Sequence, residues 1–320
     1  MNLTTTFSIP AAPVSMNHRS RVLTMGSCFA ASMGSRLSKL PLEVMTQPLG
    51  TLFHPFAITK ALSGEVSEDL YEHGGYFLHP DYHSIFTATS SADLLEDIRS
   101  VANEASTFVA SSDFLILTWG TSFSYFDKHL NKSVANCHKM PADRFEKRLS
   151  TVDEIVRDFS SLLSSLPSTT QVVLTVSPVR HTKDGMMENQ VSKSTLRVAA
   201  DIVSKQFENV HYFPAYEIML DELRDYRFYE ADMIHPNEQA QDYIWERLMA
   251  TYFDQELQTI VKKWDSIYRT LAHRPHPAKL IDHRRVLEVL LAELNGEKYQ
   301  EIDTCKIAEY VAHEIKNTYI

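Results

Sequence analysis

The chain has 320 residues, of which 44% are hydrophobic, so it can bury the core of one large domain with some chain left over. Its formal net charge is -10 at pH 7, which would repel nucleic-acid phosphates and anionic lipid headgroups, so we expect neither a nucleic acid nor a membrane as partner. The three cysteines, Cys28, Cys137 and Cys305, lie far apart without the spacing of a zinc site, as is typical of a reduced compartment.

The N-terminal segment, residues 1–21, lacks both the basic start and the continuous apolar run of a secretory signal peptide. No later segment approaches the roughly 18 uninterrupted apolar residues that a membrane-spanning helix needs. We therefore predict a cytoplasmic protein.

From residue 21 onward, short apolar runs rich in β-branched residues alternate with longer segments of helical period. This alternation is typical of a parallel sheet with crossover helices, and it predicts a three-layer α/β/α sandwich. Leu196, Ala199, Val203 and Phe207 recur three and four residues apart, which predicts an amphipathic helix packed on the sheet. The five predicted parallel strands are Arg21–Met25, Leu42–Thr46, Asp113–Trp119, Gln171–Ser177 and Val210–Pro214.

Two segments, residues 67–90 and 120–141, do not fit simple crossovers. The first is rich in aromatic, His and Gly residues, and the second is polar and aromatic without a period. Long loops inside a compact domain are more often functional than accidental. We predict that both segments form walls of a binding cleft.

Beyond about residue 255 the strand-like runs stop and a charged helical pattern takes over. Val286–Leu294 reads as a helix that ends at Asn295-Gly296, and residues 273–279 read as a linker with two prolines. The sequence therefore predicts an α/β domain over residues 1–254 and a helical extension over residues 255–320. We expect the extension to pack on the core, to contact a partner, or both.

The first predicted strand ends at Gly26-Ser27-Cys28, and a helical pattern begins directly afterwards. A turn of small residues at this place exposes a side chain and directs free N–H groups at a ligand, which suits a serine that transfers acyl groups. The alternative is that Ser27 only caps the helix. Cys28 is a rival nucleophile, because a helix N-terminus lowers the pKa of a thiol. We predict that Cys28 packs inward, since free cysteines are among the most buried residues.

Asp232 and His235 follow the fifth predicted strand, just before the helical pattern of residues 237–253. Residues three apart can lie on one side of a turn, so the Asp232 carboxylate can hold Nδ1–H of His235 and leave Nε2 as a general base. The alternative is that both are ordinary residues of a helix start. Because the carboxyl ends of parallel strands share one edge, we expect this pair to lie near Ser27.

Several segments resemble one known family, the GSCFA family, which is similar to the SGNH, or GDSL-like, hydrolases. The match covers roughly residues 20–250 and does not reach the C-terminal helices. The segments that carry it are Gly26-Ser27-Cys28-Phe29-Ala30, residues 47–55 (QPLGTLFHP), 119–121 (WGT), 134–139 (VANCHK), 177–181 (SPVRH) and 232–236 (DMIHP).

The resemblance implies a flavodoxin-like SGNH fold, with Ser27 as nucleophile, His235 as base and Asp232 as its orienting acid. It also implies an oxyanion hole that uses the backbone N–H groups of Ser27 and Gly50.

SGNH hydrolases add an asparagine after the third strand, where this chain has Gly120-Thr121-Ser122. Loss of one oxyanion donor typically lowers turnover by ~10²–10³. We predict that Asn136 replaces it. The alternatives are the Ser122 or Thr121 hydroxyl, a weak site, or Asn136 as a plain turn residue.

Three further residues are candidates for substrate binding. Arg180 and His181 follow the fourth predicted strand and suit an anionic or hydroxylated substrate, with a solvated turn as the alternative. His54 lies in a suspected cleft loop, as do His83 and His138. None of these histidines has a recognised metal-ligand spacing, so we predict no metal.

The sequence thus predicts a serine esterase of the SGNH type that cleaves a small acyl ester, such as an acetyl group on a carbohydrate. This chemistry proceeds through a serine acyl-enzyme and needs no cofactor. One alternative is an acyltransferase that uses the same three residues with a hydroxyl acceptor. Another is a non-catalytic binding or scaffold protein on the same fold.

Overall fold

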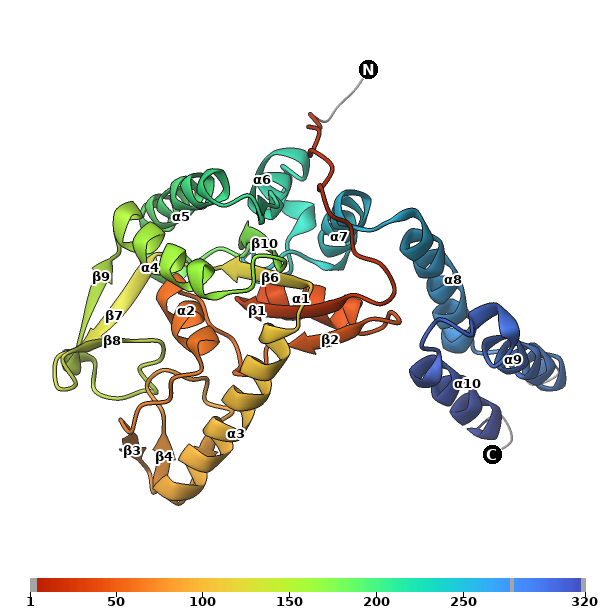
Figure 1. Cartoon of the computed structure of the whole chain (residues 1–320), viewed down its shortest axis with the longest axis horizontal. Helices are drawn as coiled ribbons and strands as arrows, with labels where there is room; N and C mark the ends of the chain where they lie inside the picture. The colour runs from red at the N-terminus through yellow and green to blue at the C-terminus, as the bar shows by residue number, and fades with distance from the viewer. Residues whose placement is uncertain (1–4, 277–278, 318–320) are drawn as a thin grey trace.

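The computed structural model describes residues 5–276 and 279–317 of the chain (Figure 1). Its central sheet has five parallel strands in the order β11-β10-β6-β1-β2. The five predicted strands are confirmed, each to within two residues at either end. Their bounds are β1 Arg21–Gly26, β2 Glu43–Thr46, β6 Phe114–Trp119, β10 Gln171–Val176 and β11 Val210–Tyr212.

Helices cover both faces of this sheet, which explains why β6 is buried along its whole length. Val22 and Ile116 point to one face, and the neighbouring Leu23 and Leu115 point to the other. The helices of the first face are α1 (Cys28–Leu37) and α7 (Glu238–Tyr252), and those of the second are α2 (Pro55–Ser63), α3 (Ser91–Ala110), α4 (Val152–Ser165) and α5 (Met186–Gln206). The predicted three-layer α/β/α sandwich is therefore confirmed.

The direction of the chain across the sheet reverses between β1 and β6. From β1 the chain moves outward to β2, and it then returns to β6 on the other side of β1 before it continues to β10 and β11. In open α/β sheets, ligands bind at such a switch point, outside the carboxyl ends of the strands. The fold therefore indicates that a ligand would bind at the carboxyl ends of β1 and β6.

The two segments predicted as long loops contain short antiparallel strands instead. One small sheet is formed by β3 (Tyr71–His73), β4 (Tyr76–Leu78) and β5 (Thr87–Ala88). Another is formed by β8 (Lys132–Val134), β7 (Phe123–Asp127) and β9 (Phe145–Leu149). Strands this short show too few alternations of apolar and polar residues to stand out in a sequence.

A buried carboxylate joins these two small sheets. Asp127 is fully buried and accepts hydrogen bonds from Tyr71 Oη at 2.7 Å and from Arg144 Nε at 2.8 Å. A charged group without solvent is stable only when it is paired in this way. The network therefore fixes the two sheets against each other.

The C-terminal helices are α8 (Gln255–Ala272), α9 (Leu280–Leu294) and α10 (Cys305–Asn317). In Figure 1, α8 leads away from the sheet, and α9 and α10 lie near the end of α8 that is farther from the sheet. The predicted helix stop is confirmed, since Asn295 is the C-cap of α9. Of the predicted linker 273–279, residues 273–276 have no regular structure, and residues 277 and 278 lie outside the described part of the chain. None of the helices in the described residues is both long and apolar enough to cross a bilayer.

Candidate active site

A cleft of about 950 Å³ opens where the carboxyl ends of β1, β6 and β10 meet. Cys28 follows β1, Thr121 follows β6, His181 follows β10, and His235 comes from the loop before α7. The segment 120–141 lines the cleft as predicted, whereas within the described segment 67–90 His83 alone reaches it. Its aromatic walls are formed by Phe53, Phe123, Tyr125 and Phe145.

At the turn after β1, Ser27 and Cys28 have the opposite orientations to those predicted. Ser27 is fully buried, and its Oγ has no hydrogen-bond partner within the described residues. Cys28 is partly exposed and lines the cleft. The prediction that Cys28 packs inward is therefore wrong, and it is the cysteine, not the predicted serine nucleophile, that faces the cleft.

The backbone of Gly26 explains this orientation. Its φ angle is 136°, and a Cβ at this position would lie 2.1 Å from the carbonyl oxygen of Thr118 on the adjacent β6. The side chain of Gln47 holds the same turn, because its amide accepts from Gly26 N–H at 3.0 Å and donates to the carbonyls of Gly26 and Ser27, both at 2.9 Å. Glycine and these three bonds turn Ser27 into the protein interior and Cys28 toward the cleft.

The thiol of Cys28 lies at the first position of α1. Burial raises its pKa above the ordinary value, while its own N–H, the positive charge of Lys193 and the N–H of Phe29 oppose this rise. The resting group is therefore a thiol at neutral pH, and it needs a base before it can attack.

Asp232 and His235 form the predicted pair. Nδ1 of His235 lies 2.7 Å from Oδ2 of Asp232, and Oδ1 of Asp232 accepts from the N–H groups of Ile234 at 2.8 Å and His235 at 3.0 Å. The bond to the His235 ring, followed by these two backbone bonds, lowers the pKa of Asp232 to about 2. The ionised carboxylate keeps the proton on Nδ1, so Nε2 is left as the basic atom.

Within the described residues, no hydrogen bond joins His235 to Cys28 or to Ser27. His235 nevertheless lines the same cleft as Cys28. Contacts between a nucleophile and its base are often long without substrate, so the shared cleft is the relevant observation.

Arg180, predicted to bind substrate, holds the loop that carries this pair. Its N–H donates to the carbonyl of Ile234 at 3.2 Å, and its Nη1 donates to that of Met233 at 3.3 Å. The guanidinium also lies 3.9 Å from the ring centre of Tyr229. Met233 has a φ of 59°, a conformation that needs such support in a residue other than glycine. Arg180 thus lines the cleft but also positions the His235 loop.

The two backbone groups predicted to form the oxyanion hole are already used. Ser27 N–H donates to the carbonyl of Thr118 at 3.1 Å, which continues the ladder between β1 and β6. Gly50 N–H donates to the carbonyl of Gln47 at 2.9 Å and so closes a turn. This part of the prediction is wrong, because an N–H group bound to a carbonyl is not free for an oxyanion.

Of the three side chains considered as a further donor, Asn136 fits best. Ser122 is fully buried and bonds to Ser192 of α5, with its N–H 2.8 Å and its Oγ 3.2 Å from Ser192 Oγ. Thr121 lines the cleft, but its hydroxyl lies 3.1 Å from the same Ser192 Oγ. Asn136 also lines the cleft, and its Oδ1 accepts from His138 N–H at 2.9 Å. That bond leaves the Nδ2 group as a donor.

His54 lines the cleft, and its ring also holds neighbouring segments of the chain. Its Nδ1 accepts from Phe56 N–H at 3.1 Å and caps α2, and its Nε2 lies 3.0 Å from Ser150 Oγ and 3.3 Å from the Ser122 carbonyl. Burial lowers its pKa to about 4. Both ring nitrogens are therefore occupied, and the ring is neutral at physiological pH.

His181 remains a candidate for substrate binding. It lines the cleft, and its Nε2 is buried without a hydrogen-bond partner in the described structure. Burial, followed by the charge of Lys193, lowers the pKa of His181 to about 4. A neutral ring with an unpaired nitrogen can accept from, or donate to, a bound hydroxyl.

The neutral state of His54 predicts a loss of stability in acid. The unfolded chain binds a proton at this histidine near pH 6.5, whereas the folded chain binds it only near pH 4. Stability is therefore complete above about pH 6.5 and falls as the pH drops toward 4, by roughly 3 kcal/mol for this one group. Urea unfolding of the wild type and of His54→Asn, which can still cap α2, checks this at both ends of the range.

The gap in unfolding free energy between the two proteins should shrink as the pH falls. His181 contributes a slope of the same sign in both proteins, so it cancels in the comparison. If the difference in unfolding free energy did not change with pH, the loss of stability in acid could not be assigned to His54.

Comparison with known proteins places these residues in one family. A model of the GSCFA family matches residues 21–248 of the chain. The chain belongs to the GSCFA family. A search of curated proteins gave no match.

The region that defines the GSCFA family contains all of the cleft residues. It begins at the first residue of β1 and ends within α7, so it leaves out α8, α9 and α10. The cleft is therefore built from the family's own region, and the helical extension lies outside it.

Lys193, which holds the chain just after β6 and β10 at the edge of the cleft, is a residue that the sequence did not lead us to expect. It is fully buried on α5, and its Nζ donates to the carbonyls of Gly120 at 2.7 Å and Ser177 at 2.8 Å. A signal was present, since Lys193 lies three residues before Leu196 on the buried stripe of this helix. A lysine on the apolar face of a helix is rarely fully buried without a specific reason.

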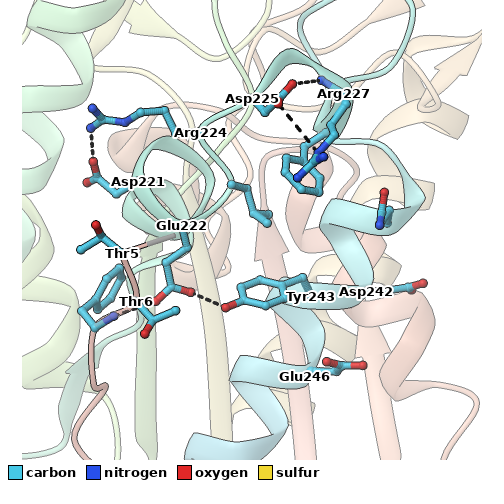
Figure 2. A pocket seen from close by; sticks show the side chains of 14 residues that line it. Thr5, Thr6, Asp221, Glu222, Arg224, Asp225, Arg227, Asp242, Tyr243 and Glu246 are labelled. Atoms are coloured by element: carbon cyan, nitrogen blue, oxygen red, sulfur yellow. Dashed lines mark hydrogen bonds and ion pairs between the residues drawn. The ribbon is translucent and has the colours of Figure 1, made fainter. Parts of the chain in front are cut away.

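A second cavity of about 840 Å³ lies between the N-terminal segment, residues 221–228 and α7. Figure 2 shows the Asp221–Arg224 and Asp225–Arg227 pairs among its charged side chains. The buried Glu222 accepts from Tyr243 Oη at 2.8 Å (Figure 2). Asp221, Glu222 and Asp225 are thus already bonded within the protein, whereas a thiol and an Asp–His pair meet in the cleft with Cys28 and His235, which remains the better candidate site.

Proposed function

We propose that this GSCFA protein is an acyl-ester hydrolase whose nucleophile is the Cys28 thiolate. The observation that carries the proposal is that Cys28, and not Ser27, lines the same cleft as His235. The bond from His235 Nδ1 to Asp232 leaves Nε2 as a general base, and the raised pKa of the Cys28 thiol makes such a base necessary.

In the proposed reaction, His235 Nε2 takes the thiol proton as Cys28 Sγ attacks the carbonyl carbon of the ester. The C–O bond breaks, the alcohol leaves with the proton from His235, and a thioester remains on Cys28. Water then gives a proton to His235 while its oxygen attacks the thioester carbonyl. The C–S bond breaks, the acid leaves, and the proton on His235 returns to Cys28 Sγ to restore the thiol. A hydroxyl acceptor in place of water would give acyl transfer by the same steps.

The start of α1 supports stabilisation of the oxyanion. The N–H groups of Cys28 and Phe29 lower the pKa of the Cys28 thiol, so they act on the atom where the reaction takes place. The amide of Asn136 adds a side-chain donor in the same cleft. Donors at a helix N-terminus favour negative charge, and this replaces the predicted pair of Ser27 and Gly50.

The likeness to SGNH hydrolases belongs to the same proposal. The sheet order and the Asp-x-x-His segment before the last helix packed on the sheet support it. For the substrate we propose a small acyl ester, such as an acetyl group on a carbohydrate. The aromatic rings of Phe53, Phe123 and Tyr125 offer flat apolar surfaces beside a few polar groups, which suits a small hydroxylated ring.

Mass spectrometry after a short reaction with p-nitrophenyl acetate tests the proposal directly. We expect one acetyl group on the wild-type chain, located on Cys28 in the peptide map. His235→Asn should slow its formation by about 10²–10⁴, the usual contribution of a general base.

The other two cysteines serve as internal controls, since Cys305 is exposed and Cys137 lines the same cleft. Equal acetylation of all three would show ordinary thiol reactivity and contradict the proposal. An acetyl group on Ser27 would return the role of nucleophile to the serine.

A further inference from the structure

We infer that Lys193 is a positioning residue that favours the thiolate form of Cys28. The inference deepens the proposed function, since it rests on Cys28 as the nucleophile. Lys193 itself does not line the cleft, so it acts on the reaction only through the thiol.

The position of Lys193 is fixed at the same sheet edge as Cys28. Its two acceptors, the carbonyls of Gly120 and Ser177, directly follow the last residues of β6 and β10. Thr118 of β6 accepts from the N–H of Ser27, the residue before Cys28. The ammonium group is therefore held at the carboxyl end of β6, next to the end of β1 from which the Cys28 turn begins.

The hydrogen bonds of Lys193 leave one position open. An ammonium group has three N–H donors, and the two carbonyls take two of them. No carboxylate pairs with Lys193 in the described residues, although a buried ammonium normally requires one. A negative charge on Cys28 Sγ would supply the missing partner.

The charges around Lys193 agree with this role. Burial lowers the pKa of Lys193 to about 7, and Cys28 is the group that acts to raise it. Lys193 in turn acts to lower the pKa of Cys28. The other titratable groups that face it are His181 after β10, which is neutral, and Tyr216 of α6 (Ala215–Glu217), whose ring centre lies 5.9 Å from Nζ.

The pH dependence of alkylation by iodoacetamide tests the inference, with peptide mass spectrometry to follow Cys28 between about pH 6 and 10. At pH 6, where Lys193 is charged, Lys193→Met should slow alkylation of Cys28 by about tenfold, because the rate follows the thiolate fraction. Above about pH 8, where Lys193 is neutral, the variant and the wild type should react at similar rates. Lys193→Arg keeps the charge and should stay close to the wild type at pH 6. Cys137, measured in the same samples, should not change. A folded Lys193→Met protein whose Cys28 reacts at the wild-type rate at pH 6 would show that Lys193 has only a structural role, and it would overturn the inference.

A second measurement needs no variant, in case Lys193→Met does not fold. The logarithm of the wild-type alkylation rate of Cys28 should rise less steeply between about pH 6 and 8, because Lys193 loses its charge in this range and the thiolate loses its partner. A tenfold rise in rate per pH unit throughout this range would overturn the inference. Neither readout needs acyl transfer, so a failure of the proposed function would appear separately, as a missing acetyl group on Cys28.

Discussion

Cys28→Ala is expected to lower kcat for p-nitrophenyl acetate by at least about 10³-fold, because it removes the sulfur that forms the thioester. The other thiol in the cleft, Cys137, cannot replace it readily, since burial raises its pKa to about 11. Ser27→Ala is the matched control, one residue away in the same turn. Ser27 Oγ is fully buried without a hydrogen bond in the described structure, so its loss should leave kcat within about threefold of the wild type. Steady-state hydrolysis of both variants, with circular dichroism to confirm folding, gives the answer.

The reverse result would be equally clear. If Ser27→Ala removed activity and Cys28→Ala kept it, the serine would be the nucleophile, as the sequence predicts. The turn would then have to reorient Ser27 toward the cleft when substrate binds.

Gly26→Ala is expected to lower the free energy of unfolding by at least about 3 kcal/mol. The new Cβ would lie 2.1 Å from the Thr118 carbonyl oxygen, and this backbone atom cannot move without breaking the ladder between β1 and β6. The φ of 136° adds strain for any residue with a Cβ. Urea unfolding followed by circular dichroism measures the loss.

Gly74→Ala separates the cost of the contact with Thr118 from the cost of a positive φ. Gly74 also has a positive φ, at 60°, but a Cβ there meets nothing within 4 Å. This variant should lose only the roughly 1 kcal/mol that left-handed backbone costs a residue other than glycine. Equal losses in the two variants would show that the contact with Thr118 does not hold the turn.

Much of the fold could be predicted from the sequence, because its strands are continuous apolar runs. A strand buried on both faces, such as β6, needs apolar residues at every position, so the pattern is visible without the structure. The strands of the small sheets are only half covered and two to five residues long. The sequence therefore suggested loops where the structure has β3 to β5 and β7 to β9.

In the candidate site, too, some contacts could be predicted from the sequence and others could not. Asp232 and His235 are three residues apart, so a local turn is enough to bring them together, and the sequence predicts their contact correctly. The contact between Lys193 and Gly120 joins residues 73 positions apart, and only the packing of α5 on the sheet creates it. The same holds for Gln47, which holds the turn at Gly26 from the end of β2.

By itself, the sequence determined that a turn of small residues follows the first strand and that an Asp–His pair lies at the same sheet edge. It could not determine which of the two residues after Gly26 faces the cleft. That choice depends on the φ of Gly26, which the Thr118 carbonyl and the Gln47 amide impose from other strands. In the tertiary structure it is Cys28 that faces the cleft, because the direction of a side chain in a turn is set by the atoms packed around it.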